Sequence, residues 1–211
     1  MLTLMAIDTE STQTSRSRLL EAGKTLFAQN GYEQTPTAAI AREAGTSESQ
    51  LMRYYGGKAG LLSAIFNQSW GTLNQLMQSR IAAAADANEA LAAILDTMVE
   101  GLTADPDAAF LFLFEGHRLR GGSEIELSQG FTDFRELMRV VVSRGRRDGT
   151  LGDRHNDEAL AVALIGAVEA LLRERLIARR GNQPDPFNDE ELKAVFLALL
   201  SGLARVVTPL S

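Results

Sequence analysis

Three polar side chains between positions 49 and 53 carry hydrogen-bonding groups that can read the edge of a base pair. Arg53 can bind guanine through two parallel hydrogen bonds, and Gln50 can bind adenine in the same way. Ser49 can donate or accept a hydrogen bond, and the adjacent Glu48 can accept one from cytosine. Groups of this kind act together when a rigid element holds them on one outward face. The surrounding sequence must therefore supply such an element.

That surrounding sequence predicts two short helices with a glycine turn between them. The first begins at Thr35, which can cap a helix, with Pro36 at the first helical position. Gly45 ends it, and the second helix begins at the N-cap residue Ser47 and ends before Gly56. A helix pair of this kind places its second helix in the major groove of DNA. Composition alone also leaves open a small helical bundle with a polar face.

The second of these helices separates a buried face from a polar one. Leu51 and Tyr55 lie four residues apart and face inward together, so Ser49 and Arg53 lie on the opposite side, with Gln50 and Thr46 beside them. The hydroxyl of Tyr54 is a good phosphate donor, and Lys58 lies at the start of the next helix, where it can meet the DNA backbone. The segment has the parts of a DNA-reading surface.

Charge is distributed unevenly along the chain. The formal net charge is −6 at pH 7. Residues 15–62 nevertheless carry six basic and four acidic side chains, a balance of +2 (6 − 4). A weakly basic head on an acidic body is typical of a protein that touches DNA through one small region.

The order of these residues resembles the helix-turn-helix head of TetR/AcrR-type transcriptional regulators. A glycine and an aromatic residue end a first helix predicted over residues 15–30, an Ile-Ala…Ala-Gly series spans the second helix and turn, and the third helix leads to a lysine and a leucine. The matching residues are Gly31, Tyr32, Ile40, Ala41, Ala44, Gly45, Leu51, Tyr54, Tyr55, Lys58 and Leu61. The likeness covers about residues 16–66.

The resemblance implies that nine side chains contact double-stranded DNA. The phosphate-binding roles fall on Tyr54 and Lys58, with Thr35 and Thr37 as further candidates, and the base-reading roles fall on the polar residues of the third helix. The full set is Thr35, Thr37, Ser47, Glu48, Ser49, Gln50, Arg53, Tyr54 and Lys58.

The third helix departs from the family pattern at two positions. Met52 stands where the family usually has a tyrosine, so a hydroxyl contact to phosphate is absent there. Tyr55 stands where a phenylalanine is usual, and we expect it to be part of the core. The chain is therefore expected to hold DNA differently around Met52.

The remaining sequence predicts an all-α protein. Further helices are expected over residues 58–85, 88–102, 105–122, 130–149, 156–180 and 188–207. The apolar run Phe110–Phe114 also fits a short buried strand, but the proline start, the length and the terminal glycines favour a helix. The expected organisation is a flexible extension (1–14), the helix-turn-helix domain (15–60) and a larger ligand-binding and dimerisation domain (61–211).

The resemblance implies a small-molecule pocket in the larger domain. Aromatic and methionine side chains with a few polar groups are typical of ligand cavities, and the same pattern at helical spacing is also typical of core. The candidates are Trp70, Met77, Met98, Phe110, Phe114, His117, Phe131, Phe134, Arg135 and Met138.

The last two helices are apolar on more than one face, so each needs cover on two sides. One side can pack in its own domain, and a second copy of the chain is the natural cover for the other; a helix buried centrally within one chain is the alternative. In TetR-like proteins the two C-terminal helices form a four-helix bundle with their mates. The candidate interface residues are Leu164, Val168, Leu171, Leu172, Phe196, Leu199, Leu200 and Leu203.

The chain lacks the residues that most catalytic and metal sites need. It has no cysteine and two histidines, His117 and His155, so thiolate and histidine-rich metal sites are excluded. Because no nucleophile–base pair or phosphate-binding glycine loop is found, we expect no enzyme, metal or other cofactor. No apolar run reaches the roughly 18 residues of a membrane span. Residues 1–14 lack the form of a signal peptide, so we expect a cytoplasmic protein without membrane contact.

These observations lead to one hypothesis and one alternative. The hypothesis is a homodimeric transcriptional repressor that binds a roughly palindromic operator and is released by a small apolar or amphipathic effector. Two recognition helices related by a twofold axis would meet half-sites about 34–36 Å apart. The alternative is a helical DNA-binding adaptor whose C-terminal body binds a protein partner and not a small ligand.

Overall fold

The computed structural model describes residues 2–116, 118–119, 126–152 and 156–203. The chain divides into two compact units. The first unit holds Met1–Ser69 and Asp107–Gln129, and the second holds Trp70–Pro106 and Gly130–Ser211. This division differs from the boundary predicted at residue 60, because the first unit reaches further along the chain and includes a later segment.

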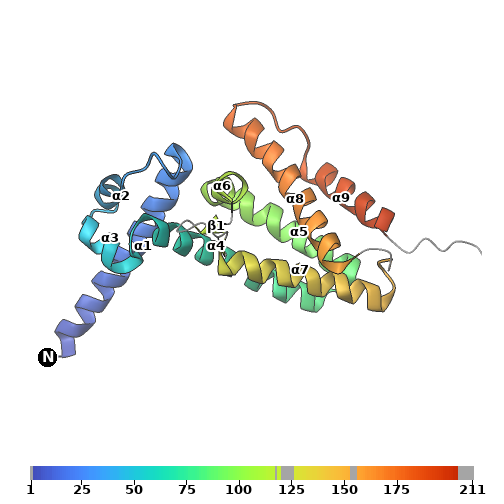
Figure 1. The fold of residues 1–211 in the computed structure, drawn as a ribbon, viewed down its shortest axis with the longest axis horizontal. Coiled ribbons are helices and arrows are strands. Elements are labelled where there is room, and N and C mark those ends of the chain that lie inside the picture. The colour runs from blue at the N-terminus through green and yellow to red at the C-terminus, as the bar shows by residue number, and fades with distance from the viewer. Residues whose placement is uncertain (1, 117, 120–125, 153–155, 204–211) are drawn as a thin grey trace, which may run out of the picture. The chain divides into compact units, whose positions relative to one another are not determined.

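The first unit is centred on three helices that pack together. They are α1 (Leu2–Asn30), α2 (Thr37–Glu43) and α3 (Glu48–Tyr55), and the beginning of α4 (Lys58–Ala83) follows them. Figure 1 shows α2 and α3 lying beside α1, and each pair among the three is in contact. Their shared core is apolar. Its fully buried side chains include Leu19, Phe27, Ile40, Leu51, Leu61 and Ile65.

The first helix is longer than the sequence predicts. The backbone of α1 is helical from Leu2, whereas a start near Ser15 is expected from the pattern. Residues 8–14 are mostly Asp, Ser and Thr, which are weak helix formers and supply no apolar face. The predicted end is confirmed, because Gly31 adopts a left-handed φ of 81° just after Asn30.

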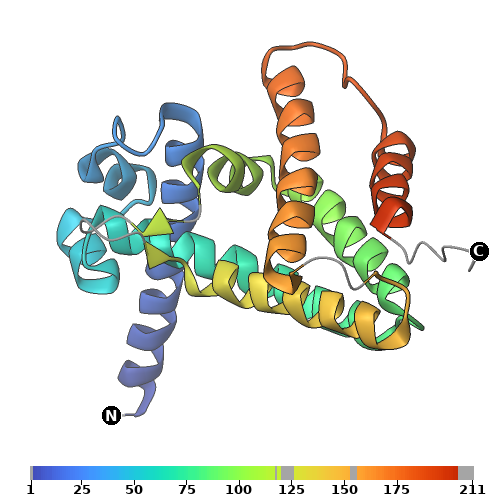
Figure 2. The same ribbon diagram turned by 45° about the vertical axis from the view of Figure 1, so that its right-hand side comes forward.

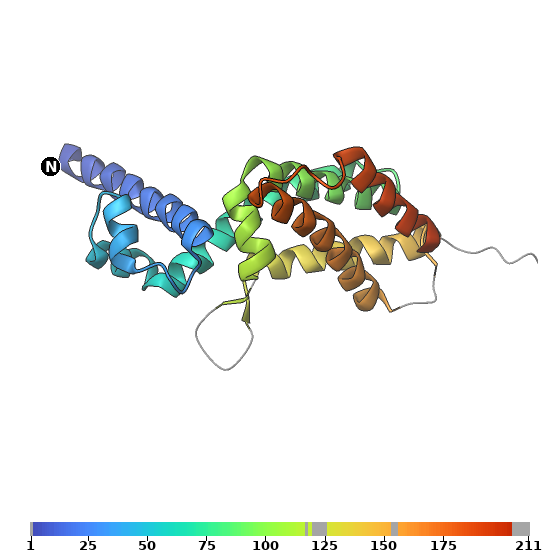
Figure 3. The same ribbon diagram turned by 90° about the horizontal axis from the view of Figure 1, so that it is seen from above.

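The middle of the chain forms two short helical segments and a hairpin. α6 (Pro106–Phe110) leads directly into η1 (Leu111–Glu115), a π-helical turn whose hydrogen bonds span one residue more than those of an α-helix. The helix prediction for this apolar run is confirmed, and the strand alternative is wrong. The helix ends earlier than the predicted stop at residues 121–122. β1 (Arg118–Leu119) then pairs antiparallel with β2 (Glu126–Leu127), as Figure 3 shows.

The π-helical turn is tied to the segment after α1. The backbone amide of Tyr32 donates a hydrogen bond to Oε1 of Glu115 at 3.3 Å. The ring of Phe112 packs against that of Phe66, with centroids 5.7 Å apart. These contacts lie within the first unit and explain why a segment from the middle of the chain groups with the N-terminal helices.

The second unit consists of the remaining helices. It contains the C-terminal part of α4, α5 (Ala87–Ala104), α7 (Gln129–Asp148), α8 (Asp157–Arg180) and α9 (Asp189–Leu203). α8 and α9 contact each other, and Figure 2 shows them running in opposite directions. Every regular element of the described chain other than β1 and β2 is helical, so the predicted all-α class is confirmed.

Glycines allow α4 to pack closely against its neighbours in this unit. A Cβ atom on Gly101 of α5 would lie 2.3 Å from Cδ2 of Leu73. One on Gly130 of α7 would lie 2.4 Å from Cβ of Trp70. A larger residue at Gly130 would therefore push these helices apart, whereas one at Gly101 would require the Leu73 side chain to move.

Candidate nucleic-acid interface

The helix α3 is fixed at both ends and on its inner face. The hydroxyl of Ser47 accepts a hydrogen bond from the amide of Gln50 at 3.3 Å, which confirms the predicted N-cap. Gly56 adopts a left-handed φ of 68°, so the predicted stop is confirmed as well. Leu51 is fully buried. The helix is thereby held as a rigid platform for the side chains on its other face.

The outer face of α3 is polar. Glu48, Ser49 and Arg53 are exposed, and Gln50 and Tyr54 are half-buried. The structure thus gathers on one surface the side chains that the sequence predicts to read bases. Their contact with DNA stays a prediction.

Two of these side chains are bonded to each other. Nη2 of Arg53 donates to the hydroxyl oxygen of Tyr54 at 2.6 Å, and the guanidinium carbon lies 4.8 Å from the centre of the tyrosine ring. A guanidinium over an aromatic face gains a cation–π interaction. The arrangement leaves further N–H donors of Arg53 for a base, because the guanidinium carries five of them.

A second pair joins α2 to α3. The hydroxyl of Thr37, the first residue of α2, donates to Oε2 of Glu48 at 2.5 Å. Glu48 also lies in the first turn of α3, where the helix dipole stabilises a carboxylate. The pair therefore gives Glu48 a structural role beside the base-reading role predicted for it.

Lys58 is anchored to the loop that follows α1. Its Nζ donates to the carbonyl oxygen of Tyr32 at 2.8 Å and to that of Glu33 at 3.3 Å. The same ammonium group lies 4.4 Å from the centre of the Tyr32 ring. Lys58 is half-buried, so a phosphate would have to share it with these partners.

The structure contradicts the predicted role of Thr35. Its side chain is 1% exposed, and its hydroxyl lies within hydrogen-bonding distance of the carbonyl oxygens of Leu26 (3.2 Å) and Gly31 (2.8 Å). Pro36, and not Thr35, occupies the N-cap position of α2, without a side-chain cap. The Thr35 hydroxyl instead closes the end of α1, so it is not available to a phosphate.

One basic side chain beside α3 was not singled out from the sequence. The hydroxyl of Tyr55 donates to the backbone carbonyl of Arg16 at 2.8 Å, and the Arg16 guanidinium carbon lies 5.6 Å from the centre of the tyrosine ring. Burial raises the pKa of the Tyr55 phenol, while the charge of Arg16 acts in the opposite direction. The exposed Arg16 is thus placed beside the recognition helix, and only its charge was visible in the sequence.

Comparison with known proteins identifies this arrangement. Residues 19–65 match the model of a family described as bacterial regulatory proteins, tetR family. The chain carries the N-terminal segment that defines the TetR family. The matched segment covers the predicted helix-turn-helix and the beginning of α4.

Individual TetR-family relatives agree over most of the chain. The HTH-type transcriptional repressor KstR2 of Rhodococcus jostii (strain RHA1) is 28% identical over 146 residues, which are 69% of this chain and 72% of KstR2. FadR from Bacillus subtilis, solved with stearoyl-CoA, has a TM-score of 0.76 at 20% identity and covers 90% of this chain and 99% of its own. AibR, solved with isovaleryl coenzyme A and operator DNA, has a TM-score of 0.68 at 20% identity, with 88% and 97% covered. The relatives are regulators, and this chain is a transcriptional regulator and not an enzyme.

Most of the predicted pocket residues are buried in the second unit. The Trp70 ring stacks on Phe134, with centroids 4.8 Å apart, and lies 5.5 Å from Phe131. This burial fits both a core and a cavity lining, so contact with a ligand stays a prediction. The buried members of the set are Trp70, Met77, Met98, Phe131, Phe134 and Met138.

The other four candidates are placed differently. Phe110 and Phe114 lie in the first unit, where their rings stack 4.9 Å apart and Phe114 is largely exposed. Arg135 forms an ion pair with Glu158 of α8. His117 lies outside the described residues.

The predicted dimer residues mostly face their own chain, which corrects the prediction. Leu171 is half-buried, Leu199 is exposed, and the Leu203 side chain is outside the described part. The sequence shows two apolar faces on each helix but not which one packs inside the unit. The side chains buried within the chain are Leu164, Val168, Leu172, Phe196 and Leu200.

A different apolar face of α8 and α9 is exposed. It combines large and small residues, which together would allow another helix to approach closely. The large exposed residues are Val162, Ile177, Val195, Leu197 and Leu199. The small ones are Ala163, Gly166, Ala170, Ala194, Ala198, Ser201 and Gly202.

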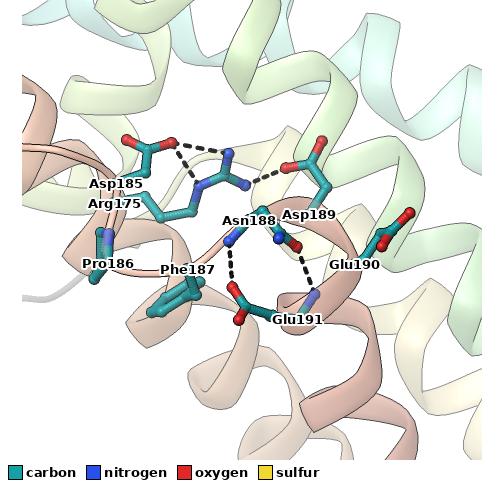
Figure 4. Close-up of a pocket in the computed structure, with 8 residues that line it drawn as sticks. All are labelled: Arg175, Asp185, Pro186, Phe187, Asn188, Asp189, Glu190 and Glu191. Atoms are coloured by element: carbon teal, nitrogen blue, oxygen red, sulfur yellow. Dashed lines mark hydrogen bonds and ion pairs between the residues drawn. The ribbon is translucent and has the colours of Figure 1, made fainter.

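Two described depressions of the second unit are lined mainly by charged side chains. The larger, about 620 Å³, lies at the start of α9, and Figure 4 shows the guanidinium of Arg175 between Asp185 and Asp189 at this site. Hydrogen bonds from Arg179 and then from Arg175 lower the pKa of Asp185 to about 2. The smaller, about 470 Å³, is lined by Arg139, Val140, Ser143, Arg146, Arg147 and Asp157.

Proposed function

We propose that this TetR-family regulator is a homodimeric repressor that binds a roughly palindromic operator and is released by an amphipathic small molecule. One observation carries the DNA-binding part. A capped helix anchored by the buried Leu51 presents Ser49, Gln50 and Arg53 on its outer face, within the segment that matches the family.

In this proposal α3 enters the major groove of each half-site. Arg53 and Gln50 read base edges, while Ser49 leaves room for close approach. Tyr54 and Lys58 bind phosphates, which set the register without reading sequence. Each side chain must then bind a phosphate beside its present partner. Tyr54 is bonded to Arg53, and Lys58 is bonded to the loop after α1.

The dimer part rests on the exposed apolar face of α8 and α9. Isolated exposed apolar side chains are common, but a continuous group with small residues between them is typical of an interaction surface. A second copy presenting the same face would bury it through an isologous contact.

The effector class is inferred from the interior and from the relatives. The cluster around Trp70 is aromatic and rich in methionine, as apolar ligand sites are. FadR and AibR were solved with acyl derivatives of coenzyme A. We therefore propose an acyl-CoA thioester as the effector.

Release requires that the effector bind better to a form of the protein that binds DNA poorly. A coupling of about 5- to 150-fold in affinity is the usual range for such an effect. Tyr32 offers a route, because its amide is bonded to Glu115 of η1 and its carbonyl to Lys58 of α4. A shift of either element would change how Lys58 is held.

The test has two stages. Duplexes are selected from a random pool with the purified protein, and the selected site is then titrated in fluorescence anisotropy with short-, medium- and long-chain acyl-CoA. We expect a palindromic site and release by one range of chain lengths, with free coenzyme A as the inactive control. A protein that selects no sequence would overturn the proposal. Selection without release by any thioester would instead support the adaptor alternative.

A further inference from the structure

Met52 is an exposed apolar residue in the middle of the recognition surface. Its side chain is 55% exposed, the largest exposed fraction among the large apolar residues of the described chain. A buried neighbour, Leu51, already supplies the inner face of α3, so Met52 has no core function. An apolar side chain left open in this place requires another explanation.

The position of Met52 on α3 puts it among the base-reading candidates. Successive helical residues turn by about 100°, so Met52 lies on the sector between Glu48 and Ser49, and Arg53 lies on the far side of Ser49. On its other flank, Tyr55 lies about 60° and Leu51 about 100° from Met52, so Met52 stands between the base-reading candidates and the face that packs on the core. A base pair that meets Ser49 is therefore within reach of the Met52 side chain.

The thioether of Met52 lies close to Gly57, in the turn that follows α3. Its sulfur lies 3.5 Å from the point that a Cβ on Gly57 would occupy, so it rests against the backbone of the turn between α3 and α4. Gly57 has a φ of 114°, which favours glycine and keeps this space open. The Met52 side chain therefore contacts the turn on one side and is exposed to solvent on the other.

The chemistry of the side chain limits what it can bind. A thioether has no donor for a phosphate and is only a weak acceptor. It is flexible and polarisable, and it packs well on apolar groups. In the major groove the apolar group that a base pair presents is the C5-methyl of thymine.

We propose that Met52 is a specificity-determining residue that selects a thymine in each half-site by packing on its C5-methyl group. The inference rests on the proposed function, because it requires α3 to lie in the major groove. It adds a base preference that the polar side chains of α3 do not supply.

The experiment removes the methyl group from the DNA and the thioether from the protein. In the selected operator, each thymine is replaced in turn by uracil, which lacks only the methyl. Binding is measured for the wild type, Met52→Ala and Leu76→Ala, the last being a matched loss of an exposed apolar side chain on α4. A double-mutant cycle isolates the pairwise interaction.

For the wild type, we expect uracil at one thymine position per half-site to weaken binding by about fourfold, the effect of one methyl-sized apolar contact. Met52→Ala loses this sensitivity at that position alone, and Leu76→Ala keeps it. Met52→Tyr, which restores the family's usual residue, also loses it. Unfolding curves check that each variant is folded.

Two results would overturn the inference. Either no thymine responds to loss of its methyl, or the response persists unchanged in Met52→Ala. Failure of the proposed function is distinct, because the protein would then select no operator at all.

Discussion

The side chains that face DNA in this proposal are already bonded within the protein. Arg53 donates a hydrogen bond to Tyr54, and Thr37 donates one to Glu48. Such pairs keep long side chains in one conformation before binding, which lowers the entropy that binding must remove. They also mean that removing one partner changes the position of the other.

Replacing Arg53 with alanine tests its role as a base reader. We expect operator affinity to fall by about 1–3 kcal/mol because a bidentate contact to a base is lost. Affinity for random duplex should fall much less. Competition titrations with both duplexes at fixed salt measure the ratio.

Tyr54→Phe is the companion variant for that measurement. It removes the hydroxyl that accepts from Arg53 and leaves the ring under the guanidinium. A similar loss on both duplexes is expected, since the hydroxyl is assigned to phosphate. Equal losses on both duplexes for Arg53→Ala as well would refute the base-reading role.

Asp185 gives a prediction for acid conditions. Its folded pKa of about 2 lies below the ordinary value of 3.8. Its contribution to stability is therefore complete above the ordinary value and is lost as the pH falls towards 2. We expect the carboxyl resonance of Asp185 to titrate near 2 in NMR spectra. Titration near the ordinary value in the folded protein would show that the Arg179 and Arg175 contacts do not persist in solution.

Residue patterns predicted part of this site correctly. The Ser47 cap follows from the preference of serine for the N-cap, and the inward Leu51 and the polar outer face follow from helical spacing. The fate of Thr35 did not follow, because a threonine before a proline fits a cap as well as a buried hydrogen bond to the preceding helix. Contacts across the fold decided between the two.

At the scale of elements, the junction between α3 and α4 depends on a glycine. A Cβ on Gly60 would lie 1.7 Å from the carbonyl oxygen of Tyr55, which is a backbone atom and cannot rotate away. α4 therefore begins closer to the end of α3 than any other residue would allow. The orientation of the recognition helix depends on this approach.

Gly60→Ala should destabilise the head and weaken operator binding. Overpacking of this kind costs about 1–3 kcal/mol. Gly71→Ala on the same helix is the matched control, because no neighbouring atom lies within 4 Å of the place its Cβ would take; helix propensity should make it neutral or stabilising by up to about 1 kcal/mol. Urea unfolding and operator titration measure both variants. Equal stability of the two variants would contradict the close approach.

The helices themselves were largely predictable, and the middle of the chain was not. Caps and glycine stops mark the ends of α3 and α8, where the sequence carries Ser47, Gly56 and Asn156. The run Leu111–Glu115 has apolar residues in succession and no period, so neither its π-helical form nor its early end could be read from spacing.

For the whole molecule, the exposed apolar face of α8 and α9 is the surface proposed to bind a second copy of the chain. The sequence predicts that each helix needs cover on two sides, and the predicted dimer face carries large apolar side chains such as Leu164 and Phe196. The structure places that face in the chain's own core and leaves a face with more small residues outside. The packing of the unit, and not hydrophobicity alone, decides which is exposed.

Val195→Glu combined with Leu199→Glu should shift the protein from dimer to monomer, since both side chains are exposed and lie one helical turn apart. Light scattering after gel filtration measures the mass. Operator affinity should fall at the same time, because the two half-sites are no longer bound together. Leu76→Glu is the control for adding charge to an exposed apolar position. A double variant that stays dimeric would place the interface elsewhere.

The π-helical turn determines how the hydrogen bond between Tyr32 and Glu115 depends on the length of the chain. A π-helical turn amounts to an α-helix with one residue inserted. Deleting a single residue from Leu111–Glu115 would therefore restore α-helical hydrogen bonding and leave the end of the segment facing nearly the same way. Glu115 would then keep its bond to the amide of Tyr32, because the lost residue is the one that the π-helical turn accommodates. Relatives with one residue fewer here can therefore connect this region to their DNA-binding helices by the same contact.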